Sequence, residues 1–243
     1  AILLNEPTKS PIVFLKLSDL KKLKEEKTMA EKILNNGAES TNFIHEFIET
    51  VVIVAVLVIV IRGFIGEPRW IPSASMRGTL LEGDRVFIEK VTTKYHLRDI
   101  KRGDILVFYP PFSKLEEGYW AKFTRFVGLF DKNEAYIKRV VAVGGDNYKI
   151  STDPKTGRSQ VFINGKLLKE DYLYEDRTID CTKNMFCGPA TVPKGYFLML
   201  GDNRANSQDG RFWGLLPQDR VIGKALFLFW PLNRITVFTT PKY

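Results

Sequence analysis

The chain is organised around one uninterrupted apolar stretch, Val51-Val52-Ile53-Val54-Ala55-Val56-Leu57-Val58-Ile59-Val60-Ile61. No side chain in these eleven residues carries a polar atom, and nine of them are β-branched. Taken alone, the stretch is consistent with a buried strand. Such a strand would, however, be about twice the usual length of five or six residues.

The flanks of this stretch favour a membrane-spanning helix instead. From residue 43 to residue 66 the segment has 24 residues, whereas a helix needs about 20 to cross a bilayer. His45, Glu46 and Glu49 lie near one end and Arg62 near the other, where long side chains reach the headgroups. We predict a transmembrane anchor over residues 43–66, preceded by an N-terminal segment, residues 1–42; the basic residues on its two sides do not decide the orientation.

Composition leaves room for one substantial domain beside the anchor. The chain has 243 residues, of which 44% are hydrophobic, and a formal net charge of +8. Its lysines and arginines are spread along the chain, without a helix-turn-helix, zinc or RNP-like pattern. This distribution argues against nucleic acid as a partner and favours attraction to membrane lipid headgroups.

Beyond residue 66 the pattern is mostly that of β-strands. Short runs rich in β-branched or aromatic residues, separated by turn residues, occupy residues 84–90, 104–109, 135–143, 160–164, 196–200 and 225–230. The pair Asn164-Gly165 suits a type I′ hairpin. We therefore predict a mainly β domain over residues 67–243, carried on an N-terminal transmembrane helix.

An interruption at residues 112–132 has helical rather than strand periodicity. Trp120, Phe123, Val127 and Phe130 recur at three- or four-residue spacing, with basic residues between them. The segment is either a helix lying in the membrane interface or a helix packed onto the β domain by its aromatic face.

Two cysteines bear on the compartment. Cys181 and Cys187 are separated by five residues in a loop-like stretch and are candidates for a disulfide, which would persist in an oxidising compartment. The alternative is a pair of free, partly buried thiols. Two cysteines lack the partners for a zinc site, and we predict no metal.

Two serines follow the predicted anchor closely, in the stretch Ile71-Pro72-Ser73-Ala74-Ser75-Met76-Arg77-Gly78. If residues 70–76 are extended, Ser73 and Ser75 point to the same side, because side chains alternate along a strand. One hydroxyl can then act as nucleophile while the other donates to the oxyanion. In isolation, such a pair is more simply two solvated hydroxyls.

The base for such a serine has few histidine candidates. Only His45, at the edge of the apolar run, and His96, in a charged stretch, occur in the chain. A lysine can serve instead, provided that burial lowers its pKa from the ordinary value of about 10.4.

Lys138 is the lysine that fits this requirement. In a strand over residues 135–143 it shares a face with Tyr136, Val140 and Ala142, so its amine would lie among largely apolar neighbours. A neutral Lys138 could take the serine proton and return it to the leaving amine. The competing interpretation is a lysine that reaches from the strand into solvent.

A third segment, residues 201–214, is dense in turn formers and hydrogen-bonding groups, as is typical of a loop that shapes a site. Asp209 and Arg211, together with Arg139, could form a cluster of charge-assisted hydrogen bonds that supports the strand of the base. A simple surface loop is the alternative.

These blocks resemble the signature boxes of the type I signal peptidases. The similar segments, which span residues 67–231 in the family's order and spacing, are Pro72–Met76, Arg102–Ile105, Tyr136–Val141 with Gly144–Asp146, and Gly201–Gly214. The chain departs from the common pattern at Gly78, where many members have proline, and a glycine there would loosen the turn after the nucleophile.

The resemblance implies roles for individual residues. Ser75 would be the nucleophile, Lys138 the general base, Ser73 an oxyanion donor beside the Ser75 amide, and Ser207 the hydroxyl that orients the lysine. The residues that fall at the substrate pocket are Ile71, Pro72 and Ile137. The implied fold is a signal-peptidase-type β-barrel or sandwich without metal or cofactor.

The expected function is that of a membrane-bound serine endopeptidase that removes signal peptides from exported preproteins after an Ala-x-Ala pattern, through an acyl-enzyme. Its partners would be signal peptides and membrane lipid, with the export translocation machinery nearby. The resemblance implies a bacterial cytoplasmic membrane, with residues 1–42 on the cytoplasmic side and the catalytic domain on the extracytoplasmic side. Two alternatives are a non-enzymatic, membrane-tethered domain that binds signal peptides, and a self-cleaving Ser/Lys protease.

Overall fold

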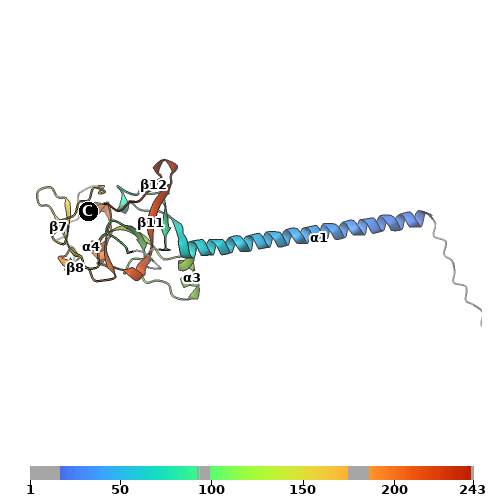
Figure 1. Cartoon of the computed structure of the whole chain (residues 1–243), viewed down its shortest axis with the longest axis horizontal. Coiled ribbons are helices and arrows are strands. Elements are labelled where there is room, and N and C mark those ends of the chain that lie inside the picture. The colour runs from blue at the N-terminus through green and yellow to red at the C-terminus, as the bar shows by residue number, and fades with distance from the viewer. Residues whose placement is uncertain (1–16, 92, 94–98, 175–185, 242–243) are drawn as a thin grey trace, which may run out of the picture. The chain divides into compact units, whose positions relative to one another are not determined.

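The computed structural model describes residues 17–91, 93, 99–174 and 186–241, which fall into two units that divide between Val56 and Leu57. The first unit is helical. Its helix α1 (Leu17–Val60) is continuous through the boundary and passes into a π-helical turn, η1 (Ile61–Ile65) (Figure 1). Of the predicted N-terminal segment, residues 17–42 thus belong to the same helix as the apolar stretch, and residues 1–16 lie outside the described residues.

The candidate membrane span covers Phe43–Ile65, within one residue of the predicted anchor. Its 23 residues have a mean hydropathy of 2.6, and their large apolar side chains are exposed. At about 1.5 Å per residue the span is about 34 Å long, enough for a hydrocarbon core of about 30 Å. Among the described residues, this is the one helix long and apolar enough to cross a membrane.

The second unit is built on an antiparallel sheet of eight strands. Seven follow one another in the order β1 (Gly66–Trp70), β2 (Arg85–Glu89), β11 (Val221–Trp230), β3 (Ile105–Phe108), β4 (Tyr136–Val143), β9 (Tyr196–Leu200) and β10 (Leu216–Pro217), and β12 (Thr236–Val237) pairs with β11. Every one of the six predicted strands is present, and the prediction of a mainly β fold is confirmed.

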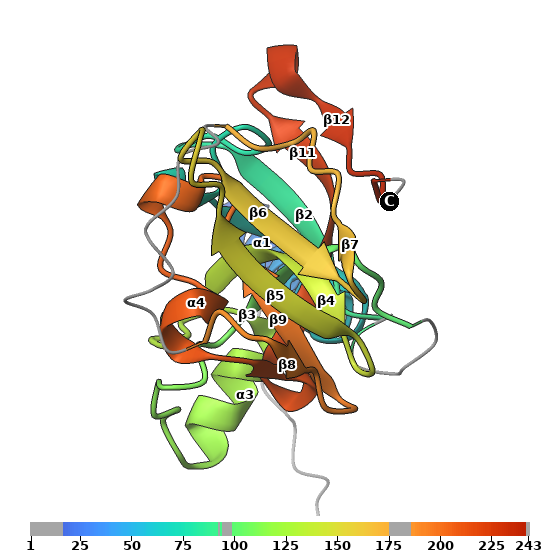
Figure 2. The ribbon, with the colours of Figure 1, turned by 90° about the vertical axis from the view of Figure 1, so that its left-hand side faces the viewer.

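A smaller sheet packs against the first. Its order is β7 (Lys166–Leu167), β6 (Ser159–Ile163), β5 (Asn147–Thr152) and β8 (Ala190–Thr191). Figure 2 shows β5 and β6 crossing the face of the domain, and their buried Ile150 and Val161 share one apolar cluster with Ala142 of β4 and Leu198 of β9. Positive φ angles of 52° and 78° at Asn164 and Gly165 agree with the predicted hairpin turn between β6 and β7.

Several strands escaped prediction, and β1 shows why. It contains Pro68, which removes a backbone donor, between the charged Glu67 and Arg69. The strand forms because it lies at the edge of the sheet and pairs with β2 alone, where a missing donor costs no ladder hydrogen bond.

The helical insertion is shorter than predicted. Helix α3 (Tyr119–Val127) ends at Gly128, whose left-handed φ of 68° closes the helix. It packs through Ala121, Thr124 and Val127, whereas Trp120 is 71% exposed. The prediction that its aromatic face packs onto the β domain is therefore wrong, because small and branched residues make that contact and the aromatic face remains outside.

The remaining helical elements are short turns. They are η2 (Ala74–Met76), η4 (Arg204–Asn206), α4 (Gly210–Trp213), η5 (Gln218–Arg220) and η6 (Leu232–Arg234). Two of them, η2 and η4, are in contact with each other, and η2 also contacts β4. These contacts bring the serine, lysine and loop segments predicted from the sequence together.

Candidate active site

The two serines lie on a turn, not on a strand. Ser73 has extended backbone angles, but residues 74–76 form η2, closed by the Arg77 amide donating to the Ala74 carbonyl at 3.0 Å. The predicted extended segment is thus wrong over these residues. The two hydroxyls are nevertheless neighbours, with 3.3 Å between the Oγ atoms of Ser73 and Ser75.

Lys138 reaches Ser75 from the middle of β4. Its Nζ donates to Ser75 Oγ at 2.7 Å and to the Ile137 carbonyl at 3.0 Å. The lysine is 4% exposed, and burial lowers its pKa from 10.5 to about 8, against the carboxylates of Asp209 and Asp202, which raise it. About a tenth of this amine is therefore neutral at pH 7, and the neutral form is the one that a base for the serine requires.

A cleft of about 440 Å³ opens onto this pair. It is lined by Pro72, Ser73, Ser75, Ile137 and Lys138, with further polar and acidic residues at its edge. Two of the three predicted pocket residues thus lie on its wall. The third does not, because Ile71 is buried in an apolar cluster with Met76 and Leu80.

Ser207 lies close to the backbone of Ser75. A Cβ at Gly201 would lie 2.2 Å from Ser207 Oγ and 2.5 Å from the Ser75 carbonyl oxygen, so both serines press against that glycine. Ser207 is 5% exposed, and its hydroxyl has no hydrogen-bond partner among the described residues. Its role in orienting Lys138 stays a prediction.

A buried ion pair lies next to Lys138 on the same strand, β4. The Arg139 guanidinium donates to both carboxylate oxygens of Asp202, at 2.9 and 2.6 Å, and to the Gly103 carbonyl at 2.9 Å. Thr79 donates to the same carboxylate at 2.6 Å. The pair ties β4 to the start of the 201–214 loop and to the chain that follows the nucleophile.

A second buried pair closes that loop on itself. Arg211 donates from Nε and Nη2 to the two oxygens of Asp209, at 2.9 and 3.0 Å, and both residues are fully buried. The Gly201 amide donates to Asp209 at 3.0 Å, and Arg211 donates to the Arg204 carbonyl at 2.7 Å. The predicted supporting residues are thus distributed over two clusters, one containing Arg139 and one containing Asp209 and Arg211.

Asn203 supports the turn that contains Ser75, and sequence reasoning did not single it out. Its backbone amide donates to the Ser75 carbonyl, and its side-chain amide donates to the Ala74 carbonyl, each at 3.1 Å. Its place in a loop dense in hydrogen-bonding groups was the available signal. These two bonds fix the turn on which Ser75 stands.

Glu170 is a second residue that sequence reasoning missed. It forms a bidentate pair with the fully buried Arg204, which also donates to Ser159 of β6 at 3.2 Å and to the Gly201 carbonyl at 3.2 Å. The pair therefore connects the smaller sheet with the catalytic loop. A lone glutamate after a short strand carries no sequence signal for this contact.

Gly78, the departure from the common family pattern, has a structural reason. Its φ is +108°, which proline cannot adopt, and a Cβ would lie 2.8 Å from the Tyr172 carbonyl oxygen. The backbone at Tyr172 thus packs directly against Gly78, and the turn after Ser75 is held in place by this contact and not loosened by the glycine.

The remaining candidates lie apart from this site. Cys187 is buried and disulfide-bonded, whereas Cys181 lies outside the described residues, so their pairing stays a prediction. His45 is on α1, and His96 lies outside the described residues. Within the described part of the chain, no group of three or more histidine, cysteine or acidic residues is arranged to hold a metal ion.

Comparison with known proteins relates this geometry to one family. Residues 44–230 match the family model described as signal peptidase, peptidase S26. A signal peptidase I of Leptolyngbya laminosa is 39% identical over 190 residues, covering 78% of this chain and 81% of that protein. Signal peptidase I T of Bacillus subtilis is 31% identical, covering 87% of this chain and 96% of that protein. Thylakoidal processing peptidase 1 of Arabidopsis thaliana is 34% identical, covering 73% of this chain and 46% of that protein.

Proposed function

This chain belongs to the S26 family of signal peptidases, and we propose that it cuts preproteins with Ser75 as nucleophile and Lys138 as general base. Membership of the family makes it a serine endopeptidase that removes signal peptides. The observation that carries the dyad is the 2.7 Å hydrogen bond between Lys138 Nζ and Ser75 Oγ at a buried site.

In the acylation step, neutral Lys138 takes the proton of Ser75 while Oγ attacks the scissile carbonyl. The new C–O bond produces a tetrahedral oxyanion, and collapse of that species breaks the C–N bond. Lys138 returns its proton to the leaving amine, which becomes the N-terminus of the mature protein. The ester left on Ser75 is then hydrolysed by a water molecule that Lys138 deprotonates in the same way.

Ser73 stabilises the oxyanion in this proposal. Its hydroxyl lies 3.3 Å from Ser75 Oγ, so an oxygen developing on the attacked carbon comes within its reach, together with the Ser75 amide. Ser207 would hold the lysine amine in line with the serine. The buried ion pairs of Arg139 with Asp202 and of Arg211 with Asp209 hold β4 and the 201–214 loop in place.

Cleavage after an Ala-x-Ala pattern is supported by the size and lining of the cleft. Pro72 and Ile137 present apolar surface beside the nucleophile, and about 440 Å³ must hold several residues of an extended peptide. Such a lining favours small side chains at the two positions of the peptide that face it.

The candidate span supports the proposed membrane placement. We propose that Phe43–Ile65 crosses a bacterial cytoplasmic membrane and that the β domain lies on its extracytoplasmic side, where preproteins emerge from the export machinery. The division into an N-terminal segment, an anchor and a catalytic domain beginning at residue 67 belongs to the same proposal.

The test is cleavage of a preprotein that bears an Ala-x-Ala site by the full chain in detergent, with products mapped by mass spectrometry. Ser75→Ala and Lys138→Met should abolish cleavage. Ser151→Ala and Lys149→Met, matched changes at β5, should not. Binding of the preprotein without cleavage by the parent would contradict the proposal, as would cleavage that survives the loss of either Ser75 or Lys138.

A further inference from the structure

Helix α3 is fixed to the last turn of the candidate span. Arg62 of η1 donates to the carbonyls of Val127 and Gly128, at 3.0 and 2.7 Å. Lys90 Nζ donates to the carbonyls of Arg62 and Phe126, at 2.8 and 3.1 Å. These bonds satisfy carbonyls at the C-terminal end of α3 and hold that helix beside η1.

This attachment places α3 at the membrane surface. The inference rests on the proposed function in one respect, that Phe43–Ile65 spans a bilayer. If it does, residues 61–65 lie where the hydrocarbon ends, and α3, in contact with them through Phe64 and Phe126 with 5.0 Å between ring centroids, lies at headgroup level.

The exposed face of α3 suits that position. Tyr119 is 95% exposed and Trp120 71% exposed, and Trp120 contacts the half-exposed Phe123 with 5.7 Å between ring centroids. Such a cluster is unfavourable in water, whereas aromatic side chains are enriched at membrane–water interfaces.

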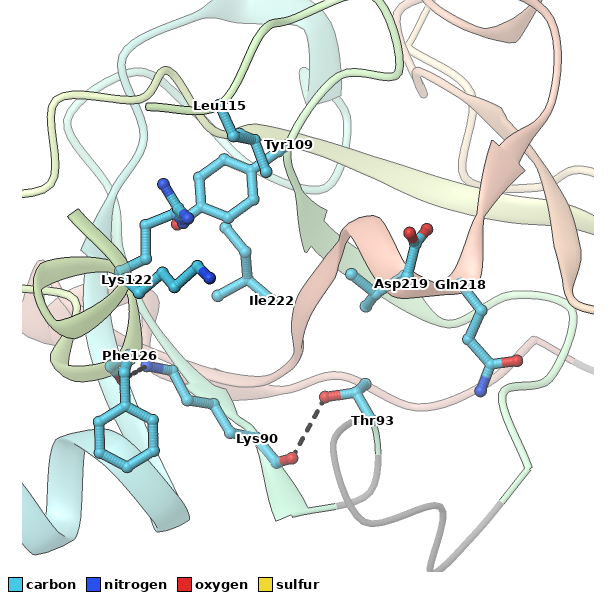
Figure 3. Close-up of a pocket in the computed structure, with 11 residues that line it drawn as sticks. Lys90, Thr93, Tyr109, Leu115, Lys122, Phe126, Gln218, Asp219 and Ile222 are labelled. Atoms are coloured by element: carbon cyan, nitrogen blue, oxygen red, sulfur yellow. Dashed lines mark hydrogen bonds between the residues drawn. The ribbon is translucent and has the colours of Figure 1, made fainter. Parts of the chain in front are cut away.

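A cavity of about 630 Å³ lies between α3 and the segment formed by η5 and β11. Lys122, Arg125 and Phe126 of α3 line one wall, and Asp219 and Ile222 line the other. Figure 3 shows Lys122 and Asp219 on opposite sides of the opening, with Phe126 beside Lys90. The walls of the cavity therefore combine apolar surface with charged side-chain groups.

The charge around this cavity is positive. Lys122 and Arg125 face one acidic lining residue, Asp219. Below them, Glu67 is the carboxylate that Arg62, Arg69 and Lys90 share, at 3.6, 2.5 and 2.8 Å. Among the lining residues, Lys90, Lys122 and Arg125 outnumber the single acid Asp219, and an anion would complement this positive excess.

We propose that this cavity binds the phosphate headgroup of an anionic phospholipid of the surrounding bilayer, with Lys122 and Arg125 as its ligands. Arg125 offers planar donors to phosphate oxygens, and Lys122 offers a mobile ammonium. The acyl chains extend past Phe126 toward the span, while Trp120 and Phe123 insert beside them. The site thereby fixes the height and tilt of the catalytic domain at the membrane, so that the cleft meets a substrate that also emerges there.

The test uses the full chain released from membranes into mild detergent. Native mass spectrometry follows the binding of phosphatidylglycerol, phosphatidylcholine and inorganic phosphate as each is titrated. The double variant Lys122→Gln/Arg125→Gln should raise the apparent Kd for phosphatidylglycerol by about tenfold or more, since a charge-assisted hydrogen bond contributes about 1.5–3 kcal/mol. The matched variant Lys149→Gln/Lys166→Gln, with two exposed lysines of the smaller sheet, should leave that Kd unchanged.

A second measurement does not depend on the double variant. In nanodiscs that contain brominated lipid, the parent should lose more tryptophan fluorescence than Trp120→Phe, because Trp120 would be in contact with the bromine atoms. Equal quenching of both proteins would overturn the placement of α3. Equal affinity of parent and double variant for phosphatidylglycerol, or binding of inorganic phosphate but not of the lipid, would overturn the site.

Failure of this proposal is distinguishable from failure of the proposed function. Neither Lys122 nor Arg125 lines the catalytic cleft, so cleavage of a short Ala-x-Ala peptide in detergent should proceed at the parent rate in the double variant. Flotation of the parent with vesicles reports on the span itself. If the parent cleaves the peptide and floats with vesicles, but binds phosphatidylglycerol no more tightly than phosphatidylcholine, the lipid site alone would be refuted.

Discussion

The rate of cleavage should follow the neutral fraction of Lys138 as pH is changed. Burial sets the pKa of this lysine at about 8, and only the neutral amine can take the proton of Ser75. At pH 7 about 9% of such an amine is neutral, against about 0.03% for a lysine with a pKa of 10.5, so burial increases the active fraction about 300-fold. Activity should rise with pH because the neutral amine is the active form, and the lowered pKa places this rise near pH 8 and not near pH 10.5.

The assay is kcat/KM for a short fluorogenic Ala-x-Ala peptide, measured in detergent from about pH 5 to about pH 10. Below the midpoint the value should fall by about tenfold for each pH unit, and above it the profile should level off. The fluorescence spectrum of the enzyme at each pH controls for unfolding. A profile that is flat through this range, in an enzyme that remains folded, would remove Lys138 from the role of base.

Three further predictions concern the same site. Lys138→Met should abolish cleavage yet raise the free energy of unfolding at pH 7 by up to about 3 kcal/mol, because the native state no longer holds a protonated amine in a buried position. Chemical denaturation should show that this gain disappears above about pH 10.5, where the lysine of the unfolded parent is also neutral. Ser73→Ala should lower kcat by about 10²–10³-fold with an unchanged unfolding midpoint, and an unaltered kcat would exclude Ser73 as oxyanion donor. Asp202→Asn should shift the pH profile to lower pH, since the Asp202 carboxylate raises the pKa of Lys138, and Arg139→Gln should shift it to higher pH, since it leaves that carboxylate without its guanidinium. Shifts of the same sign would contradict this electrostatic account.

The sequence predicted the framework of this domain well, for a physical reason. Strands such as β4 and β9 are short runs of β-branched and aromatic residues bounded by turn formers, so their pattern is local. Lys138 could be singled out from its apolar neighbours on one strand face, although a lysine that reaches from the strand into solvent fits the same pattern, and its role as base stays a prediction. Family resemblance then connected it with Ser75.

Contacts that depend on the distant course of the chain were not predictable. Residues 74–76 form a turn because Asn203, far along the chain, binds two of their carbonyls. Glu170 contacts the catalytic loop only because the smaller sheet folds back onto β4. In both cases, the residue type is compatible with an ordinary surface position, and only the fold brings it to the site.

The arrangement of buried charges around the dyad explains how Lys138 remains a usable base. Two carboxylates, Asp209 and Asp202, lie close enough to raise its pKa and so oppose the effect of burial. Each forms a bidentate ion pair, with Arg211 and Arg139 respectively, and the guanidinium charge offsets part of the carboxylate's effect on the lysine. Since desolvation remains the largest effect on the lysine, the same pairs that hold the loop and β4 together also allow the amine to lose its proton near neutral pH. Rigidity and basicity at this site therefore have one structural source.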